Sequence, residues 1–283
     1  MRHLEAPGIE ARISFTTCIS GARPTTRARL EAFEDAVAAA SNEYEAAAKQ
    51  QALHTLTHLA SEPTGHQDRT SLKKVYKDRM VKETSPGRHI YETIRGATNK
   101  CPLCGEGVVT TLDHHLPRSA YPLLSVVPVN LVPACRDCNI GKGETQPAHA
   151  SEQTLHPYFD DFSYHPWLCA RVRRPRGSEP MSMEFFVDPH PDWNDTLTNR
   201  LRTHLRVFDL DYRYRQLVAT HIAATNHDLR VTPIKDVSSW LTRKAEGWAH
   251  EGNPNTMGCA LYRGLAADEW YANGGWRIQE ADS

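Results

Sequence analysis

The sequence predicts an α+β fold that is mostly α, with helical N- and C-terminal regions around a small central module. Apolar residues recur at helical spacing before residue 98 and again after residue 195. Between these regions, a short β-prone run lies beside two Cys-x-x-Cys pairs. We therefore divide the 283 residues into three regions: 1–98, 99–146 and 147–283.

The N-terminal region is expected to be helical from about residue 24 to residue 98. A helix start is predicted at Pro24, which is followed by two hydroxyl side chains. The next apolar residues share one helix face: Leu30, Phe33, Val37, Ala40, Tyr44, and further on Leu53, Leu56 and Leu59. After a break at 62–65, helices are expected over about 71–82 and 87–95. The apolar face predicts a bundle core, with a coiled-coil partner surface as the alternative.

Composition sets broad limits on the class of protein. The net charge of -1, with 40% hydrophobic and 24% charged residues, is ordinary for a water-soluble globular chain. Seven cysteines, of which Cys18, Cys169 and Cys259 lie outside the Cys-x-x-Cys pairs, argue against a secreted disulfide scaffold. The first residues carry no apolar signal core, and no apolar run reaches the roughly 18 residues of a membrane span. We therefore expect a cytoplasmic protein without a membrane partner.

Basic residues gather locally in front of the cysteine segment, although the whole chain is nearly neutral. They are Lys73, Lys74, Lys77, Arg79, Lys82, Arg88, Arg95 and Lys100. A solvated helix face is one interpretation, and a surface that follows nucleic-acid phosphates is the other.

Two short hooks predict a zinc site. They are Cys101-Pro-Leu-Cys104 and Cys135-Arg-Asp-Cys138. Tetrahedral zinc takes soft thiolate ligands that tight turns supply in pairs, so the four cysteines are expected to form a closed, structural Zn²⁺ site.

The segment between and after the hooks carries residues suited to hydrolysis. The β-prone run 108–112 leads into Asp113 and His114, and a helix is expected from Cys135 to Lys142, so that Asn139 points back towards the strand end. A histidine with a near-neutral pKa is a suitable general base. The oxygens of Asp113 and Asn139 suit a hard divalent cation, Mg²⁺ or Mn²⁺, which acts as a Lewis acid.

Taken in order, these motifs resemble the HNH endonuclease family, whose ββα-metal fold often carries a zinc staple. The resemblance covers residues 99–146. It implies that His114 is the first histidine of the HNH motif and the general base, and that Asn130 is the asparagine of the motif, which fixes the loop near that histidine. Asn139 would stand where the motif has its last histidine, as in the HNH domain of RNA-guided CRISPR nucleases. It also implies a nucleic-acid substrate, DNA before RNA. Bacterial proteins of this kind are often nuclease effectors of anti-phage or restriction systems, with an ATPase or a sensor as partner.

Two departures from the family pattern leave alternatives open. His115 replaces the usual apolar residue after the catalytic histidine, and adjacent side chains of an extended segment face opposite ways, so only one of His114 and His115 faces the metal. Spacing from Asp113 favours His114. Asn139 removes an imidazole ligand, which favours an oxygen-preferring metal over zinc at the catalytic position. The competing function is a zinc-stapled module that binds nucleic acid or protein without catalysis.

The C-terminal region carries less information. A hairpin is expected between 167–173 and 183–187, across Pro175-Arg176-Gly177. The arginines Arg171, Arg173, Arg174 and Arg176 make its turn basic, either as a solvated tip or as a phosphate contact. Leu197, Leu201, Leu205 and Phe208 predict a helix, and further helices are expected over about 211–226, 233–249 and 258–271.

Overall fold

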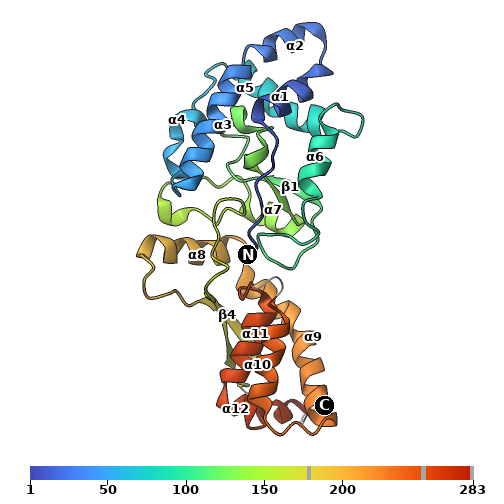
Figure 1. Ribbon diagram of the computed structural model, residues 1–283, viewed down its shortest axis with the longest axis vertical. Coiled ribbons are helices and arrows are strands. Elements are labelled where there is room, and N and C mark those ends of the chain that lie inside the picture. Colours follow the sequence, from blue (N-terminus) through green and yellow to red (C-terminus); the bar gives the residue numbers. More distant parts are fainter. Residues whose placement is uncertain (177–179, 250–252, 281–283) are drawn as a thin grey trace. The chain divides into compact units, whose positions relative to one another are not determined.

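A computed structural model describes residues 1–176, 180–249 and 253–280, and it consists of helices with two two-stranded sheets in the described part (Figure 1). This confirms the predicted α+β, mostly α class. The chain divides into two compact units. The N-terminal unit is His3–Asp161, and the C-terminal unit is Phe162–Ser283 together with Met1–Arg2. The predicted boundaries at residues 98 and 146 lie inside the N-terminal unit, and the division into three regions stays a prediction.

Helices make up the first half of the N-terminal unit. They are α1 Ala11–Ser20, α2 Pro24–Glu31, α3 Glu34–Lys49, η1 Leu53–Thr55, α4 Thr57–Ala60, α5 His66–Val75, the π-helix η2 Tyr76–Val81, and α6 Arg88–Arg95. The predicted start at Pro24 is confirmed, and α6 matches the expected helix over 87–95. Helix α1 was not predicted, and α5 begins before the expected start at residue 71.

The long apolar stripe of this unit lies on several helices rather than one: α2, α3, η1 and α4. Helix α2 ends at Glu31, and α3 begins with Glu34 and Asp35 in its first turn. Both carboxylates accept hydrogen bonds from Arg12, at 2.6 Å each. Acidic side chains are favourable at a helix N-terminus, so a new helix starts here.

Burial confirms the interpretation of the stripe as a bundle core. Except for Phe33, which is partly buried, all the stripe residues from Leu30 to Leu59 are buried in one hydrophobic cluster. This cluster also contains apolar residues of the segment 112–131, so the helices pack directly against the cysteine-containing module. Removing apolar surface from water stabilises a fold by about 25 cal/mol per Å², so this cluster is the main stabilising element of the unit.

The central module contains two short strands and a helix. Strand β1 (Thr111–His114) pairs antiparallel with β2 (Leu131–Ala134), with Asp113 opposite Val132 and His114 opposite Leu131. Helix α7 (Arg136–Lys142) follows, as expected. The 3-10 turns η3 (Pro122–Leu124) and η4 (Pro128–Asn130) lie between the strands.

The first strand begins later than the sequence predicted. We expected it over 108–112, but Val108 forms an isolated bridge with Lys100, and the Val109 N–H donates to the Asn99 carbonyl at 3.0 Å. These residues close the first cysteine hook, and regular pairing with β2 starts only after them. Asp113 and His114 consequently end the strand, as predicted.

The C-terminal unit packs helices against a second hairpin. The strands are β3 (Leu168–Arg173) and β4 (Ser182–Val187), and the helices are α8 Asp195–Val207, α9 Leu210–Val231, α10 Val237–Gly247, α11 Met257–Ala267 and α12 Glu269–Ala272, followed by the 3-10 turn η7 Gly275–Glu280. A Cβ at Gly264 would collide with the Ala170 carbonyl, so α11 lies close against β3. The predicted hairpin is confirmed, and Gly177 of its expected turn lies outside the described residues.

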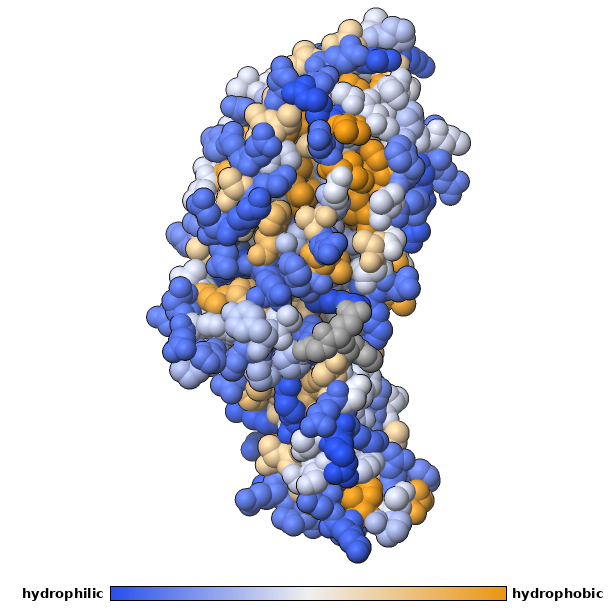
Figure 2. All heavy atoms as spheres, in the orientation of Figure 1, coloured by the Kyte–Doolittle hydropathy of each residue, from blue (hydrophilic) through white to orange (hydrophobic). Residues whose placement is uncertain are grey.

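Side chains at the helix starts explain several boundaries of this unit. Asn194, Asp236, Thr256 and Asp268 each accept a hydrogen bond from a backbone N–H in the first turn of the helix that follows. Such caps satisfy backbone donors that have no partner within the helix. Hydrophilic residues cover much of the displayed face, with apolar residues between them (Figure 2). Within the described ranges, no helix combines the length and the apolar character that crossing a bilayer requires.

Candidate functional site

The four predicted cysteines form one buried cluster. Cys101, Cys104, Cys135 and Cys138 place their sulfur atoms within 4.8 Å of one another, and the Cys104 and Cys135 sulfurs are 3.9 Å apart. Four thiolates around one zinc at about 2.3 Å would have sulfur–sulfur distances of about 3.8 Å. Both the donor atoms and their spacing therefore fit a zinc ion.

Local backbone geometry builds the first hook of this cluster. The Gly105 N–H donates to the Cys101 carbonyl, and the Cys101 N–H donates to the Gly107 carbonyl, both at 2.7 Å. Gly105 has a φ of +77°, which favours glycine. At Gly107, a Cβ would lie 2.7 Å from the Cys135 sulfur, so this position has no space for a side chain. The Gly107 N–H also donates a hydrogen bond to the Cys104 sulfur at 3.3 Å, a contact that suits a thiolate bound to a metal.

The second hook continues directly into α7. Cys135 is the N-cap residue of the helix, and Cys138 lies in its first turn. Hydrogen bonds from neighbouring thiols, that of Cys101 first, lower the pKa values of Cys104 and Cys135. The same hydrogen bonds raise the pKa values of Cys101 and Cys138, and zinc binding requires the thiolate form of the cysteines.

Beside the cluster, a pocket of about 270 Å³ brings together three of the predicted catalytic residues. Asp113 and His114 reach it from β1, and Asn139 reaches it from α7. Its lining is completed by Tyr76, Thr111, Leu112, Pro117, Arg118, Gly143 and Glu144. The end of a strand and the first turns of a helix thus place a carboxylate, an imidazole and a carboxamide around one hollow.

His114 is held in one tautomer. Its Nε2 lies 2.9 Å from the Ser125 carbonyl, and a carbonyl only accepts hydrogen bonds, so Nε2 carries the proton and Nδ1 has the lone pair. Burial lowers the pKa of His114 to about 3, so the ring is neutral at neutral pH. The ring also packs edge-on against Tyr76, with 4.4 Å between centroids.

Asp113 is buried and ion-paired with Lys142. The Lys142 Nζ is 3.2 Å from Oδ2 and 3.4 Å from Oδ1 of Asp113, and it donates to the His114 carbonyl at 2.7 Å. Burial raises the pKa of Asp113 to about 6, although Lys142 opposes that shift. This ammonium therefore connects α7 to the end of β1 and orients the carboxylate.

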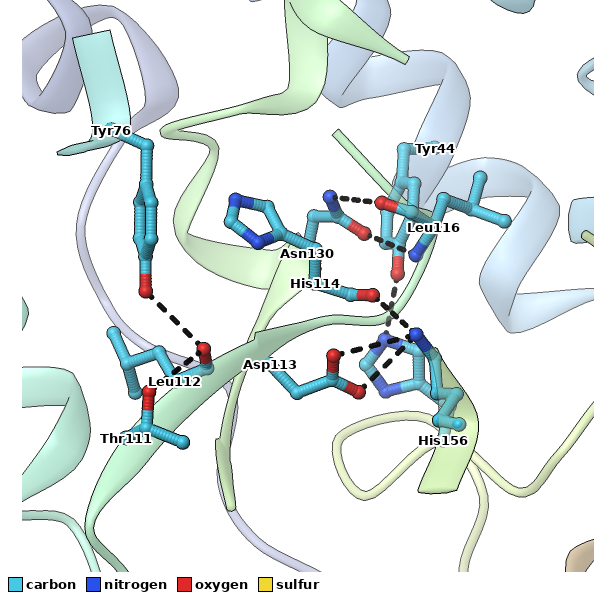
Figure 3. A network of polar contacts seen from close by, with 10 residues as sticks. Tyr44, Tyr76, Thr111, Leu112, Asp113, His114, Leu116, Asn130 and His156 are labelled. Atoms are coloured by element: carbon cyan, nitrogen blue, oxygen red, sulfur yellow. Dashed lines mark hydrogen bonds and ion pairs between the residues drawn. The ribbon is translucent and has the colours of Figure 1, made fainter. Parts of the chain in front are cut away.

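Asn130 is fully buried and holds the chain after the strand. Its Oδ1 accepts from the Leu116 N–H at 2.8 Å, and its Nδ2 donates to the Leu116 carbonyl at 3.0 Å (Figure 3). The same Nδ2 also donates to the Leu124 carbonyl at 3.2 Å. Asn130 is not among the residues that line the pocket. Its contacts are those of a residue that fixes the loop between the two strands.

The two adjacent histidines have different surroundings. His114 lines the pocket, whereas the ring of His115 packs against His156, with 4.2 Å between centroids. His156 in turn lies 2.9 Å from the Tyr44 hydroxyl, and all three side chains are buried. The geometry therefore places His114 at the pocket and His115 in the core.

Three residues of this site escaped the sequence analysis. Tyr76 belongs to the π-helix η2, Ser125 contributes only a backbone carbonyl, and Arg118 follows shortly after His114 in the sequence. Only Arg118 had a signal in its sequence position. π-Helical turns often mark functional sites, but their hydrogen bonding is visible only in a structure.

Comparisons with known proteins define no class for this chain. No protein-family model matches the sequence, and no solved structure matches it. The chain is similar to protein ea31 of Escherichia phage lambda, with 32% identity over 192 residues, which is 64% of this chain and 64% of ea31. The matched region thus spans less than two thirds of that relative.

Proposed function

We propose that this protein is a metal-dependent HNH-type endonuclease that hydrolyses phosphodiester bonds of nucleic acid, with DNA favoured over RNA as the substrate. The observation that supports the proposal best is the pocket that Asp113, His114 and Asn139 share. These three residues occupy the positions of the family motif, and they come from the end of a strand and from the helix that follows the second cysteine hook.

In this proposal, His114 is the general base. The Ser125 carbonyl holds the proton on Nε2, so Nδ1 is the atom that accepts a proton from the attacking water. The ring is neutral at neutral pH and can therefore accept that proton, but the pKa of about 3 that burial gives it makes it a weaker base than the near-neutral histidine expected from the sequence. Tyr76 and Asn130 keep the ring and the neighbouring loop in place.

Asp113 and Asn139 are the residues that would hold Mg²⁺ or Mn²⁺. Both offer oxygen donors, which these ions prefer. A bound divalent ion supplies positive charge that neutralises the phosphate and the departing oxygen. The ammonium of Lys142 already stabilises the ionised form of Asp113, because it lowers the pKa that burial raises.

The zinc ion of the four-cysteine cluster has a structural role in this account. Four sulfur ligands close the coordination sphere and leave no position for substrate. The cluster would fix the start of α7, and hence Asn139, relative to β1.

The alternative is a zinc-stapled module that binds nucleic acid or protein without catalysis. One observation favours it: Asp113 already has a buried partner in Lys142, so the carboxylate is satisfied within the protein. A binding module, however, has no need for a buried histidine in the lining of the same pocket.

The resemblance to HNH proteins extends the proposal to a biological role. We place the protein among nuclease effectors of anti-phage or restriction systems, in the cytoplasm, with an ATPase or a sensor as protein partner. Co-purification from cells with a tagged copy of this chain tests this part, and an ATPase or sensor recovered in fixed proportion supports it.

A nuclease assay tests the enzymatic proposal. The purified protein is incubated with supercoiled plasmid, linear duplex, single-stranded DNA and RNA, in Mg²⁺ or Mn²⁺ and with EDTA. Cleavage that EDTA abolishes and that His114→Ala removes supports the endonuclease. Binding of DNA without cleavage in either metal supports the alternative.

A further inference from the structure

Arg118 lines the pocket and has no carboxylate partner among the described residues, whereas half of the arginines of the N-terminal unit have one. Arg12, Arg27, Arg29, Arg88 and Arg95 each pair with an Asp or Glu. Among the residues that the structure describes, no ion pair involves Arg118. The pocket lining contains two carboxylates, Asp113 and Glu144, and neither pairs with Arg118.

The position of Arg118 is nevertheless well defined. Its Nη1 donates to the Lys73 carbonyl of α5 at 3.1 Å, and its guanidinium lies over the Tyr76 ring, 5.5 Å from the centroid. The same Tyr76 ring also contacts the ring of His114, with 4.4 Å between centroids. One hydrogen bond to a carbonyl uses one of the five N–H donors of a guanidinium, and the others can reach a ligand.

A half-buried guanidinium without a carboxylate in the lining of a pocket suits an anion. The planar fork of arginine binds two oxygens of a phosphate at once, and hydrogen bonds between charged groups are stronger than those between neutral ones. Lys142, the other cation of the site, is already neutralised by Asp113. Arg118 is therefore the cation of this pocket that is open to a ligand.

We propose that Arg118, held over Tyr76, binds a backbone phosphate of the nucleic acid and positions it in front of His114. This inference rests on the proposed function, since it names the residue that holds the substrate of the same pocket. Arg118 would bind the substrate and take no part in proton transfer. Replacing Arg118 is therefore expected to change the affinity for nucleic acid more than the turnover rate at saturation.

The test compares Arg118→Gln with Arg27→Gln. Arg27 lies on α2 and pairs with Glu31, so its replacement removes the same charge away from the pocket. Binding of a fluorescently labelled DNA duplex and of its single strand is measured by anisotropy in EDTA, over a series of salt concentrations. Zinc content and melting temperature verify the fold.

Arg118→Gln is expected to weaken binding about tenfold and to lower the slope of log Kd against log salt by about one, because one phosphate contact is lost. In the cleavage assay it is expected to raise KM more than it lowers kcat. Arg27→Gln is expected to keep the wild-type Kd. Wild-type affinity and slope in Arg118→Gln overturn the inference.

A second variant keeps the test valid if Arg118→Gln does not fold. Arg118→Lys keeps the charge but loses the planar fork, so it is expected to keep the salt slope and to bind more weakly than wild type. Wild-type affinity in that variant overturns the inference as well. A wild-type protein that cleaves DNA while both variants bind normally refutes only the role of Arg118. A wild-type protein that neither binds nor cleaves nucleic acid refutes the proposed function too.

Discussion

The four-cysteine cluster and the pocket beside it share helix α7 but are two different kinds of site. In the cluster, four sulfur atoms face one another and are closed off from solvent. The pocket of about 270 Å³ is instead lined by a histidine and by two residues with oxygen-bearing side chains. A closed set of soft donors stabilises a fold, whereas an open set of hard donors leaves room for substrate.

The two sites also differ in where their support comes from. The hooks of the cluster are held by glycines and backbone hydrogen bonds within a few residues of each cysteine. The pocket depends on groups outside β1 and α7: the Tyr76 ring contacts both His114 and Arg118, and the Ser125 carbonyl sets the tautomer of His114. Changes at the cluster should therefore act on stability, and changes at the pocket should act on ligand binding and turnover.

The largest expected effect is loss of the metal from the cluster. Cys104→Ser or Cys138→Ser should release zinc and unfold the central module, because structural zinc supplies about 10–16 kcal/mol of apparent binding free energy in small folds. Elemental analysis and thermal melting are the measurements, and Cys169→Ser in the C-terminal unit is the control. Zinc-free wild-type protein, or a Cys104→Ser protein with unchanged melting, would contradict the assignment.

The next largest effect is expected at the buried ion pair. Asp113→Ala leaves the Lys142 ammonium buried without its partner, so we expect a loss of about 3–5 kcal/mol in the free energy of unfolding. Adding Lys142→Met should restore a large part of that loss, because no unpaired charge remains. Urea unfolding of the two variants measures this. Equal stability of Asp113→Ala and wild type would show that the pair does not hold β1 and α7 together.

A smaller effect is expected at the glycines of the first hook. Gly107→Ala places a methyl group 2.7 Å from the Cys135 sulfur and should cost about 1–3 kcal/mol while weakening zinc binding. Gly105→Ala meets open space but must keep a φ of +77°, so about 1–2 kcal/mol is expected without direct damage to the ligands. Competition with a zinc chelator measures the difference. Greater zinc loss from Gly105→Ala than from Gly107→Ala would contradict the close contact between Gly107 and the Cys135 sulfur.

The smallest effect is expected for the neutral oxygen donor of the pocket. Asn139→Ala should weaken the affinity for the catalytic ion about tenfold, because it removes one neutral oxygen donor. Loss of a group that supports a metal ligand changes metal affinity on the same scale. Asn139→Asp should retain binding, because it keeps an oxygen and adds a negative charge. The dependence of cleavage rate on Mn²⁺ concentration is the readout. An unchanged Mn²⁺ dependence in Asn139→Ala would remove this residue from the metal site.

The sequence predicted the parts of the site that depend on local spacing. The cysteine hooks, the helix after Cys135, and the position of Asp113 and His114 at a strand end follow from short-range patterns. The contacts of Tyr76 and Ser125 with His114 join segments far apart in the chain, and no periodicity encodes them. The break between α2 and α3 was missed for the same reason, because Arg12 stabilises the start of α3 from another helix.

The central claim, that this pocket hydrolyses phosphodiesters, is tested most directly by comparing His114→Ala with His115→Ala. In a plasmid-cleavage assay with Mg²⁺ or Mn²⁺, His114→Ala is expected to lower the rate about 10²- to 10⁴-fold with zinc content and melting temperature near wild type. His115→Ala is expected to reduce stability, because its ring packs against His156 in the core, while the folded protein keeps most of its rate. Wild-type cleavage by His114→Ala, or wild-type activity that persists in EDTA, would contradict the account.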